Sequence, residues 1–194
     1  MKSYAKMLVF IIILGAVTSL IFVGMEVWTA PLIEANAALE LKSTILDANG
    51  EAYTIATANQ AFAEAIETFE QEDLTLYRHK GSGSLSYEFS GSGVWGPIVG
   101  IITLESDLET IRHLRVLQQE ETPGLGGVVA DPTYLQGYFG VHMVPELAFV
   151  VPGSERLPNQ VDRITGATRT SNSFRTILNS SYLRYLEFMQ EVGD

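Results

Sequence analysis

The distribution of apolar residues divides the chain into one continuous N-terminal run and a region of short, interrupted segments. Met7–Met25 is 19 residues long, contains no charged side chain and is rich in Ile, Leu, Val and Phe. That length matches the ~20 residues that a helix needs to cross the hydrocarbon core of a bilayer. The pattern predicts one transmembrane helix, and the Ala-, Leu- and Glu-rich residues 31–46 predict that it continues as a helical stalk.

Two later stretches also have helical spacing. One begins at Thr57, a candidate N-cap, and one apolar face contains Ala61, Phe62, Ala65, Ile66 and Phe69. The other is predicted over 168–189, and its recurring apolar residues are Phe174, Ile177, Leu178, Leu186 and Met189. Together they predict one helix before and one helix after the central part of the chain.

The central part alternates short apolar runs with turn residues, which is typical of β-strands. Strands are expected over 74–77, 85–89, 98–104, 111–117 and 147–151. The short connections between the first four of these strands predict antiparallel pairing, because parallel strands need long crossovers. The expected fold class is α+β, an antiparallel sheet packed with helices and preceded by one N-terminal transmembrane helix. The loop Glu120–Tyr138 is longer than a simple connection needs, which favours a functional role.

Charge on either side of the apolar run indicates its orientation. Lys2 and Lys6 precede the run, whereas Glu26 and Glu34 follow it, so the positive-inside rule places the N-terminus in the cytoplasm. A cleavable signal peptide is disfavoured because the run is long and the triplet Ala35-Asn36-Ala37 lies far beyond it. We expect residues 1–28 to be the cytoplasmic end and anchor, 29–50 a helical stalk and 51–194 an extracytoplasmic domain.

The amino-acid composition excludes or disfavours several classes of function. The chain has no Cys, which excludes thiolate metal sites, iron–sulfur clusters and disulfides. A net charge of -11 argues against electrostatic binding of nucleic acid. The three histidines are scattered without metal-ligand spacing, and no Ser–His–Asp arrangement is discernible, so we expect neither a metal site nor catalytic residues.

A turn rich in small and hydroxyl residues precedes the last predicted helix. It reads Asp-Arg-Ile-Thr-Gly-Ala-Thr-Arg-Thr-Ser-Asn over 162–172. Unpaired N–H groups and the helix dipole make such a turn a candidate anion site. Hydroxyl residues also cap many helices without any ligand. The residues alone leave both interpretations open.

Residues 91–96 match the glycine pattern of dinucleotide-binding turns, but their context does not. That fingerprint requires a helix immediately after the glycines. Here Pro97-Ile98-Val99-Gly100-Ile101-Ile102 follows, which predicts a strand. The glycines are better explained by a tight turn or a close approach of the backbone to a ligand.

The segment Asp162-x-x-Thr165-Gly166-Ala167-Thr168 resembles the flavinylation motif of the FMN-binding domain family. That family includes the NqrC component of the sodium-translocating NADH:quinone reductase (Nqr) and the RnfG component of the Rnf electron-transport complex. The resemblance implies covalent FMN, joined through its phosphate to the side-chain oxygen of Thr168. It also implies that Arg163 and Arg169 flank the phosphate.

Two further segments resemble the same family. Glu121-Thr122-Pro123-Gly124-Leu125-Gly126 is similar to its second signature, a loop lying against the flavin, with Leu125 packing on the ring. Gly91-Ser92-Gly93-Val94-Trp95 is similar to a segment of the Nqr version, which implies that Trp95 neighbours the flavin. Glu121 is expected to order its loop and not to act as an acid or base.

The resemblance implies an electron-carrier subunit with no complete active site of its own, within an Rnf- or Nqr-type ion-translocating oxidoreductase of the bacterial inner membrane. Its partners would be the other subunits and a flavin transferase for maturation. Two alternatives stay open at this stage. One is a stand-alone anchored flavoprotein that feeds an external reductase, and the other is a non-redox interaction or assembly module.

Overall fold

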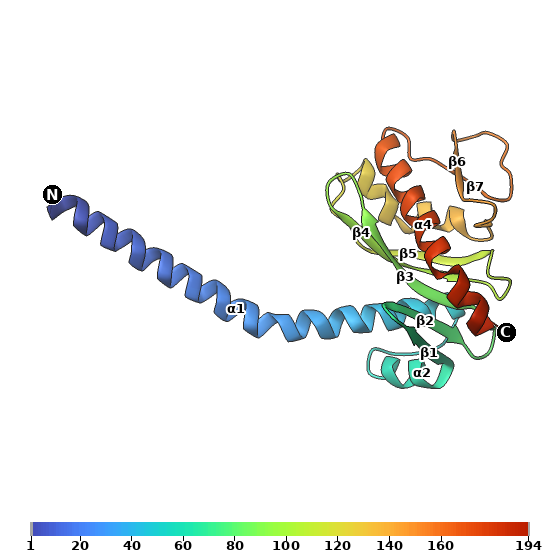
Figure 1. The fold of residues 1–194 in the computed structure, drawn as a ribbon, viewed down its shortest axis with the longest axis horizontal. Coiled ribbons are helices and arrows are strands. Elements are labelled where there is room, and N and C mark those ends of the chain that lie inside the picture. Colours follow the sequence, from blue (N-terminus) through green and yellow to red (C-terminus); the bar gives the residue numbers. More distant parts are fainter. Residues whose placement is uncertain (1, 194) are drawn as a thin grey trace. The chain divides into compact units, whose positions relative to one another are not determined.

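The computed structural model describes residues 2–193 and comprises two compact units, Met1–Glu40 and Leu41–Asp194. The first unit lies within the long helix α1 (Lys2–Asn49), which contains Pro31 (Figure 1). Within the described residues, α1 is the one helix long and apolar enough to cross a membrane, judged by length and composition. The predicted apolar run is therefore helical and is followed without interruption by the predicted stalk.

The C-terminal turns of α1 belong to the folded unit. Ile45 and Leu46 are fully buried, whereas the apolar side chains of residues 7–25 are exposed. The helix ends at Asn49, and Gly50 follows with a φ of 71°, a left-handed conformation that glycine adopts without strain. Arg112 Nε donates a hydrogen bond to the carbonyl oxygen of Ala48 at 2.9 Å, which satisfies one of the free carbonyls at this helix end.

The centre of the folded unit is a five-stranded antiparallel sheet in the order β1-β2-β3-β4-β5 (Figure 1). Its strands are β1 (Ile66–Gln71), β2 (Leu74–His79), β3 (Leu85–Ser92), β4 (Pro97–Leu104) and β5 (Ile111–Gln118). Only two residue pairs join β2 to β3, whereas eight join β3 to β4. The expected α+β class with an antiparallel sheet is confirmed.

A long helix and a chain of short elements complete the unit. After β5 come the 3-10 helix η1 (Gly126–Ala130), α3 (Pro132–Leu135) and the 3-10 helix η2 (Gln136–Tyr138). The strands β6 (Ala148–Val150) and β7 (Gln160–Asp162) then pair in parallel, and α4 (Thr168–Gly193) is the last element. The long loop expected after β5 is thus largely made of short helical turns.

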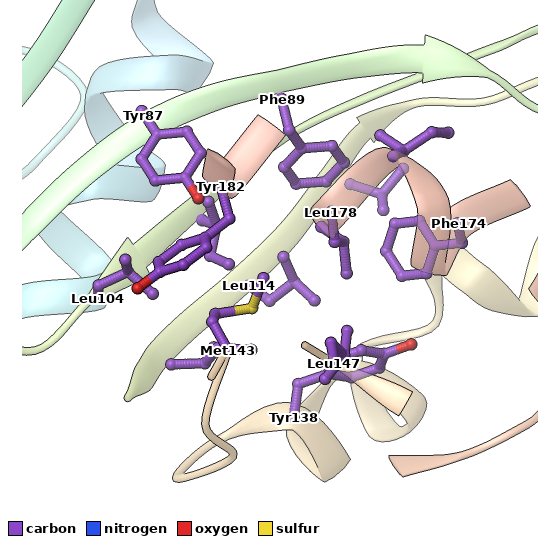
Figure 2. Close-up of a cluster of buried hydrophobic side chains, with 14 of the residues drawn as sticks. Tyr87, Phe89, Leu104, Leu114, Tyr138, Met143, Leu147, Phe174, Leu178 and Tyr182 are labelled. Atoms are coloured by element: carbon purple, nitrogen blue, oxygen red, sulfur yellow. The ribbon is translucent and has the colours of Figure 1, made fainter. Parts of the chain in front are cut away.

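The core lies between β3 and α4. Figure 2 shows Tyr87 and Phe89 of β3 beside Phe174, Leu178 and Tyr182 of α4. Phe89 and Phe174 are both fully buried, with ring centroids 5.9 Å apart in an edge-to-face arrangement. This packing fixes the start of α4 against the sheet, which matters because the candidate anion turn lies directly before it.

One secondary-structure prediction is wrong. The helix after Thr57 is only α2 (Ala58–Ala65), and Ile66 and Phe69 lie in β1. Six consecutive residue pairs join β1 to β2. Ile66 and Phe69 are β-branched and aromatic residues, which favour strands, so pairing in the sheet overrides the helical spacing of these apolar residues. Thr57 is at the N-cap position, but its side chain makes no capping hydrogen bond.

We expect Phe174→Ala to lower the free energy of unfolding by about 3–5 kcal/mol, because it removes a fully buried ring and leaves a cavity. Leu183→Ala on the same helix is the matched control, since Leu183 is 68% exposed and its removal should change stability by less than about 0.5 kcal/mol. Thermal or chemical denaturation of both variants measures the difference. Equal stabilities would contradict the assignment of this core.

Candidate functional site

The turn before α4 is held in shape by its own hydrogen bonds. Ala167 N–H donates to the carbonyl oxygen of Ile164 at 3.2 Å, and Gly166 has a φ of 80°, which a side chain rarely tolerates. Ser171 Oγ accepts from Ile164 N–H at 3.1 Å and donates to the carbonyl oxygen of Ala167 at 3.0 Å. The glycine of the motif is therefore required by the backbone conformation of the turn.

The four hydroxyl groups of this turn have different surroundings. Ser171 is fully buried, and Thr170 Oγ1 donates to Glu121 Oε2 at 2.6 Å. Thr165 and Thr168 are exposed. Thr168 is the first residue of α4, where backbone N–H groups have no partner within the helix and the helix dipole favours an anion. The Thr168 hydroxyl is thus accessible at a helix N-terminus, whereas the hydroxyls of Thr170 and Ser171 are buried in the interior.

Glu121 is a buried carboxylate that accepts hydrogen bonds from two other segments. Its Oε1 accepts from the backbone N–H groups of Val94 at 2.7 Å and Trp95 at 3.0 Å, while Oε2 accepts from Thr170. The residue is only 3% exposed. Burial raises the pKa of Glu121, but the hydrogen bonds from Thr170, Trp95 and Val94 outweigh burial and lower the pKa below its usual value. The carboxylate is therefore ionised at neutral pH.

Two glycines pack directly against this carboxylate. A Cβ on Gly93 would lie 2.5 Å from Glu121 Oε1, and a Cβ on Gly126 would lie 2.6 Å from both Glu121 Oε2 and Thr170 Oγ1. Neither glycine has a positive φ. Their role is therefore close approach and not backbone freedom.

The three motif segments surround one cavity of about 290 Å³. It is lined by Val94, Trp95, Glu121, Thr122, Leu125, Gly126, Gly166, Ala167, Thr168, Arg169 and Thr170. Trp95 is 71% exposed and Leu125 is 48% exposed, so both offer apolar surface to a ligand in the cavity. The cavity thus combines phosphate-binding donors at the start of α4 with two accessible apolar surfaces. This combination fits FMN, whose phosphate and flat ring need these two environments.

The cavity includes eight of the twelve residues predicted for the site. The predicted residues that do not line it are Asp162, Thr165, Pro123 and Gly124. Sequence reasoning did not assign Val94 and Thr170 as contacts, although both lie within the quoted segments. Arg169 lines the cavity and is exposed beside Thr168, as expected for a residue that flanks an anion.

Asp162 lies apart from the cavity. Its Oδ2 accepts a hydrogen bond from Arg156, and its backbone carbonyl accepts one from Tyr134 at 3.1 Å. Asp162 Oδ1 is buried and has no hydrogen-bond partner among the described residues. The Asp162 side chain therefore makes no hydrogen bond to the turn that carries Thr168, because its pairing with Arg156 directs the carboxylate elsewhere.

Two of the histidines, His79 and His113, are buried or half-buried within the folded unit. His79 is 8% exposed, with Nε2 2.9 Å from Glu51 and Nδ1 2.8 Å from Ser82. His113 is half-buried, and burial lowers its pKa, so its ring is neutral at pH 7. Over residues 2–193 no group of three or more His, Cys, Asp or Glu side chains is placed to hold a metal ion.

Comparison with known proteins gives one domain match and several relatives. Residues 93–182 match the profile described as the FMN-binding domain. The chain is 33% identical to NqrC, the C component of the Na+-translocating NADH-quinone reductase, of Pseudomonas aeruginosa, over 60% of this chain and 50% of that protein. It is 28% identical to the Vibrio vulnificus NqrC, over 66% of this chain and 57% of that protein. The chain thus spans about half the length of these relatives.

Solved structures agree with this result. The crystal structure of Parabacteroides distasonis NqrC superposes with a TM-score of 0.68 at 25% identity, covering 81% of this chain and 95% of that one. Shewanella oneidensis NqrC superposes with a TM-score of 0.69 at 18% identity, covering 79% and 96%. At that lower identity the likeness supports the fold alone.

We expect Gly126→Ala to destabilise the folded unit by about 1–3 kcal/mol, because the new methyl group collides with Glu121 and Thr170. Gly137→Ala is the control, since a Cβ there meets nothing within 4 Å and the residue has no positive φ. Thermal denaturation of the two variants measures the difference. A Gly126→Ala variant as stable as Gly137→Ala would contradict the packing described here.

Proposed function

We propose that the chain is a membrane-anchored flavoprotein subunit that relays electrons within an Nqr- or Rnf-type complex, because residues 93–182 match the profile of the FMN-binding domain. The relatives with 28% and 33% sequence identity to this chain are subunits of a Na+-translocating NADH-quinone reductase, which favours the Nqr type. The observation that carries the proposal is the convergence of all three motif segments on one cavity with an exposed hydroxyl at a helix N-terminus.

We further propose that the flavin is attached through a phosphoester to Thr168 Oγ1. Thr170 and Ser171 lie in the same turn, but the Thr170 hydroxyl donates to Glu121 and the Ser171 hydroxyl is buried within the turn. Thr165 is exposed but does not line the cavity. Thr168 is the hydroxyl residue at the cavity wall that also adjoins the first N–H groups of α4, where a phosphate is stabilised.

The remaining residues of the site would hold the cofactor, and the cofactor itself would supply the redox chemistry. FMN transfers one or two electrons by itself, so the protein must bind it, tune it and leave an edge accessible. Arg169 adds positive charge beside the phosphate. Trp95 and Leu125 offer apolar surfaces to the ring and shield it in part from water.

Localisation and partners follow from the anchor and the cofactor. We propose that residues 1–28 begin in the cytoplasm and span the bacterial inner membrane, residues 29–50 form the stalk and residues 51–194 carry the flavin outside the cytoplasm. Lys2 and Lys6 on one side of the apolar run support this orientation. Free FMN is scarce outside the cytoplasm, so a covalent bond prevents its loss. The partners would be the other subunits of the complex and a flavin transferase that forms the bond.

Thr168→Ala should abolish covalent flavin, because it removes the oxygen that forms the ester, while the folded unit stays intact since Thr168 is exposed. Thr165→Ala is the matched control in the same turn and should keep the flavin. Intact mass and in-gel flavin fluorescence of denatured protein from flavinylating membranes distinguish the two. Flavin retained in Thr168→Ala would refute the linkage, and an unmodified native protein would favour a non-redox assembly module.

Topology is tested with reporters fused after residue 194. An alkaline phosphatase fusion should be active, because this enzyme is active only outside the cytoplasm. A green fluorescent protein fusion at the same position should be non-fluorescent, because the exported protein does not form its fluorophore. Replacing Lys2 and Lys6 with Glu should weaken this preference, because positive charge on the cytoplasmic side sets the orientation. A fluorescent fusion to the unchanged chain would contradict the proposed localisation.

A further inference from the structure

We propose that Glu121 is a positioning residue that assembles the flavin cavity before the cofactor binds and whose negative charge holds the potential of the bound flavin low. This inference rests on the proposed function for its second half only. The first half concerns the protein without cofactor. The geometry that carries it is one buried carboxylate bonded to two different segments of the cavity wall.

The positioning role follows from what each hydrogen bond joins. Glu121 Oε1 holds the backbone of Val94 and Trp95, which lie in the short connection between β3 and β4. Oε2 holds Thr170 in the first turn of α4. Trp95 is 26 residues and Thr170 is 49 residues from Glu121 in sequence. Their proximity to Glu121 therefore depends on tertiary contacts and not on local structure. The carboxylate therefore links the backbone of Trp95 to Thr170 in the first turn of α4.

Glu121 supplies the side-chain hydrogen bonds to the connection that carries Trp95. Gly93 N–H donates to the carbonyl oxygen of Gly96 at 2.8 Å, and the segment between them contains only Val94 and Trp95. Trp95 itself is 71% exposed, so its side chain gains little packing within the domain. Loss of Glu121 leaves two N–H donors without their charged acceptor, which frees the connection to move.

The electrostatic role follows from which charges line the cavity. Glu121 and Arg169 are the ionisable residues among its lining residues. Arg169 is exposed to water and adjoins the phosphate position, whereas Glu121 is buried, so water screens its charge much less. A reduction step in which no proton accompanies the electron would add negative charge to the cavity that this carboxylate lines. A fixed buried anion therefore disfavours the reduced flavin.

Glutamine is an informative replacement because it has the same shape without the charge. Its carbonyl oxygen can accept from Val94 and Trp95, and its amide can donate to Thr170, whose hydroxyl can also accept. Glu121→Gln should therefore keep the cavity assembled and remove only the electrostatic effect. Glu121→Ala removes both, and Thr170→Val removes one hydrogen bond while leaving the charge in place.

The positioning role is tested on full-length Thr168→Ala protein without flavin, in detergent. Amide hydrogen exchange at Val94 and Trp95 should become at least about tenfold faster in the Glu121→Ala background and stay within about threefold of the parent in Glu121→Gln. Thr170→Val provides a second variant if Glu121→Ala does not fold, and it should speed exchange of the Ser171 N–H, which donates to the carbonyl oxygen of Ala167 at the start of α4. Unchanged exchange at Val94 and Trp95 in a folded Glu121→Ala variant would overturn the positioning role.

The electrostatic role is tested by redox titration of the flavin-carrying protein with dithionite and mediator dyes. At a fixed ambient potential, Glu121→Gln should raise the ratio of reduced to oxidised flavin about tenfold. This corresponds to a reduction potential higher by about 59 mV for a one-electron step. Glu120→Gln is the matched control, because Glu120 carries the same charge one residue away but is exposed and does not line the cavity. Equal shifts in the two variants would overturn the electrostatic role.

The two tests separate this inference from the proposed function. If the native chain carries no flavin in flavinylating membranes, the proposed function fails, whereas the exchange measurement on cofactor-free protein still decides the positioning role. If flavin is present and Glu121→Gln titrates like the parent protein, the proposed function stands and the electrostatic role fails.

Discussion

The buried carboxylate of Glu121 is the interaction on which the rest of the site depends. Removing a carboxylate from water is unfavourable unless donors replace the water, and here two backbone N–H groups and one hydroxyl do so. This requirement explains why the surrounding residues are small. Gly93 and Gly126 approach the carboxylate more closely than any side chain permits. Three short motifs that look independent in the sequence are therefore parts of one hydrogen-bonded arrangement.

The hydroxyl groups at the start of α4 differ in their surroundings, because two are buried in the fold and one stays accessible. Ser171 closes the turn, Thr170 bonds the buried carboxylate and Thr168 stays accessible. The two interpretations of this turn as helix cap and anion site are thus not exclusive. Because Phe174 anchors the next turn of the same helix in the core, the accessible hydroxyl is presented on a rigid element.

Polar contacts also join the end of α1 to the sheet within the folded unit. Arg112 bonds the carbonyl oxygen of Ala48, and Ser84 Oγ donates to Asn49 Oδ1 at 2.6 Å. Ile45 and Leu46 add fully buried side chains from the same turns of the helix. The last turns of the long helix are therefore part of the domain core and not a free linker.

The sequence by itself determined the long apolar N-terminal helix, the α+β class and the motif residues, because each depends on local composition or spacing. An uncharged apolar run of 19 residues has the length that a helix needs to cross a bilayer, whatever the rest of the chain does. Only the tertiary structure decided that Ile66 and Phe69 are strand residues, since pairing with β2 overrides their helical spacing. It also decided that Glu121 meets Val94, Trp95 and Thr170 and that Asp162 turns toward Arg156. These contacts join residues whose proximity depends on how the sheet and α4 pack, and a linear pattern carries no information about that packing.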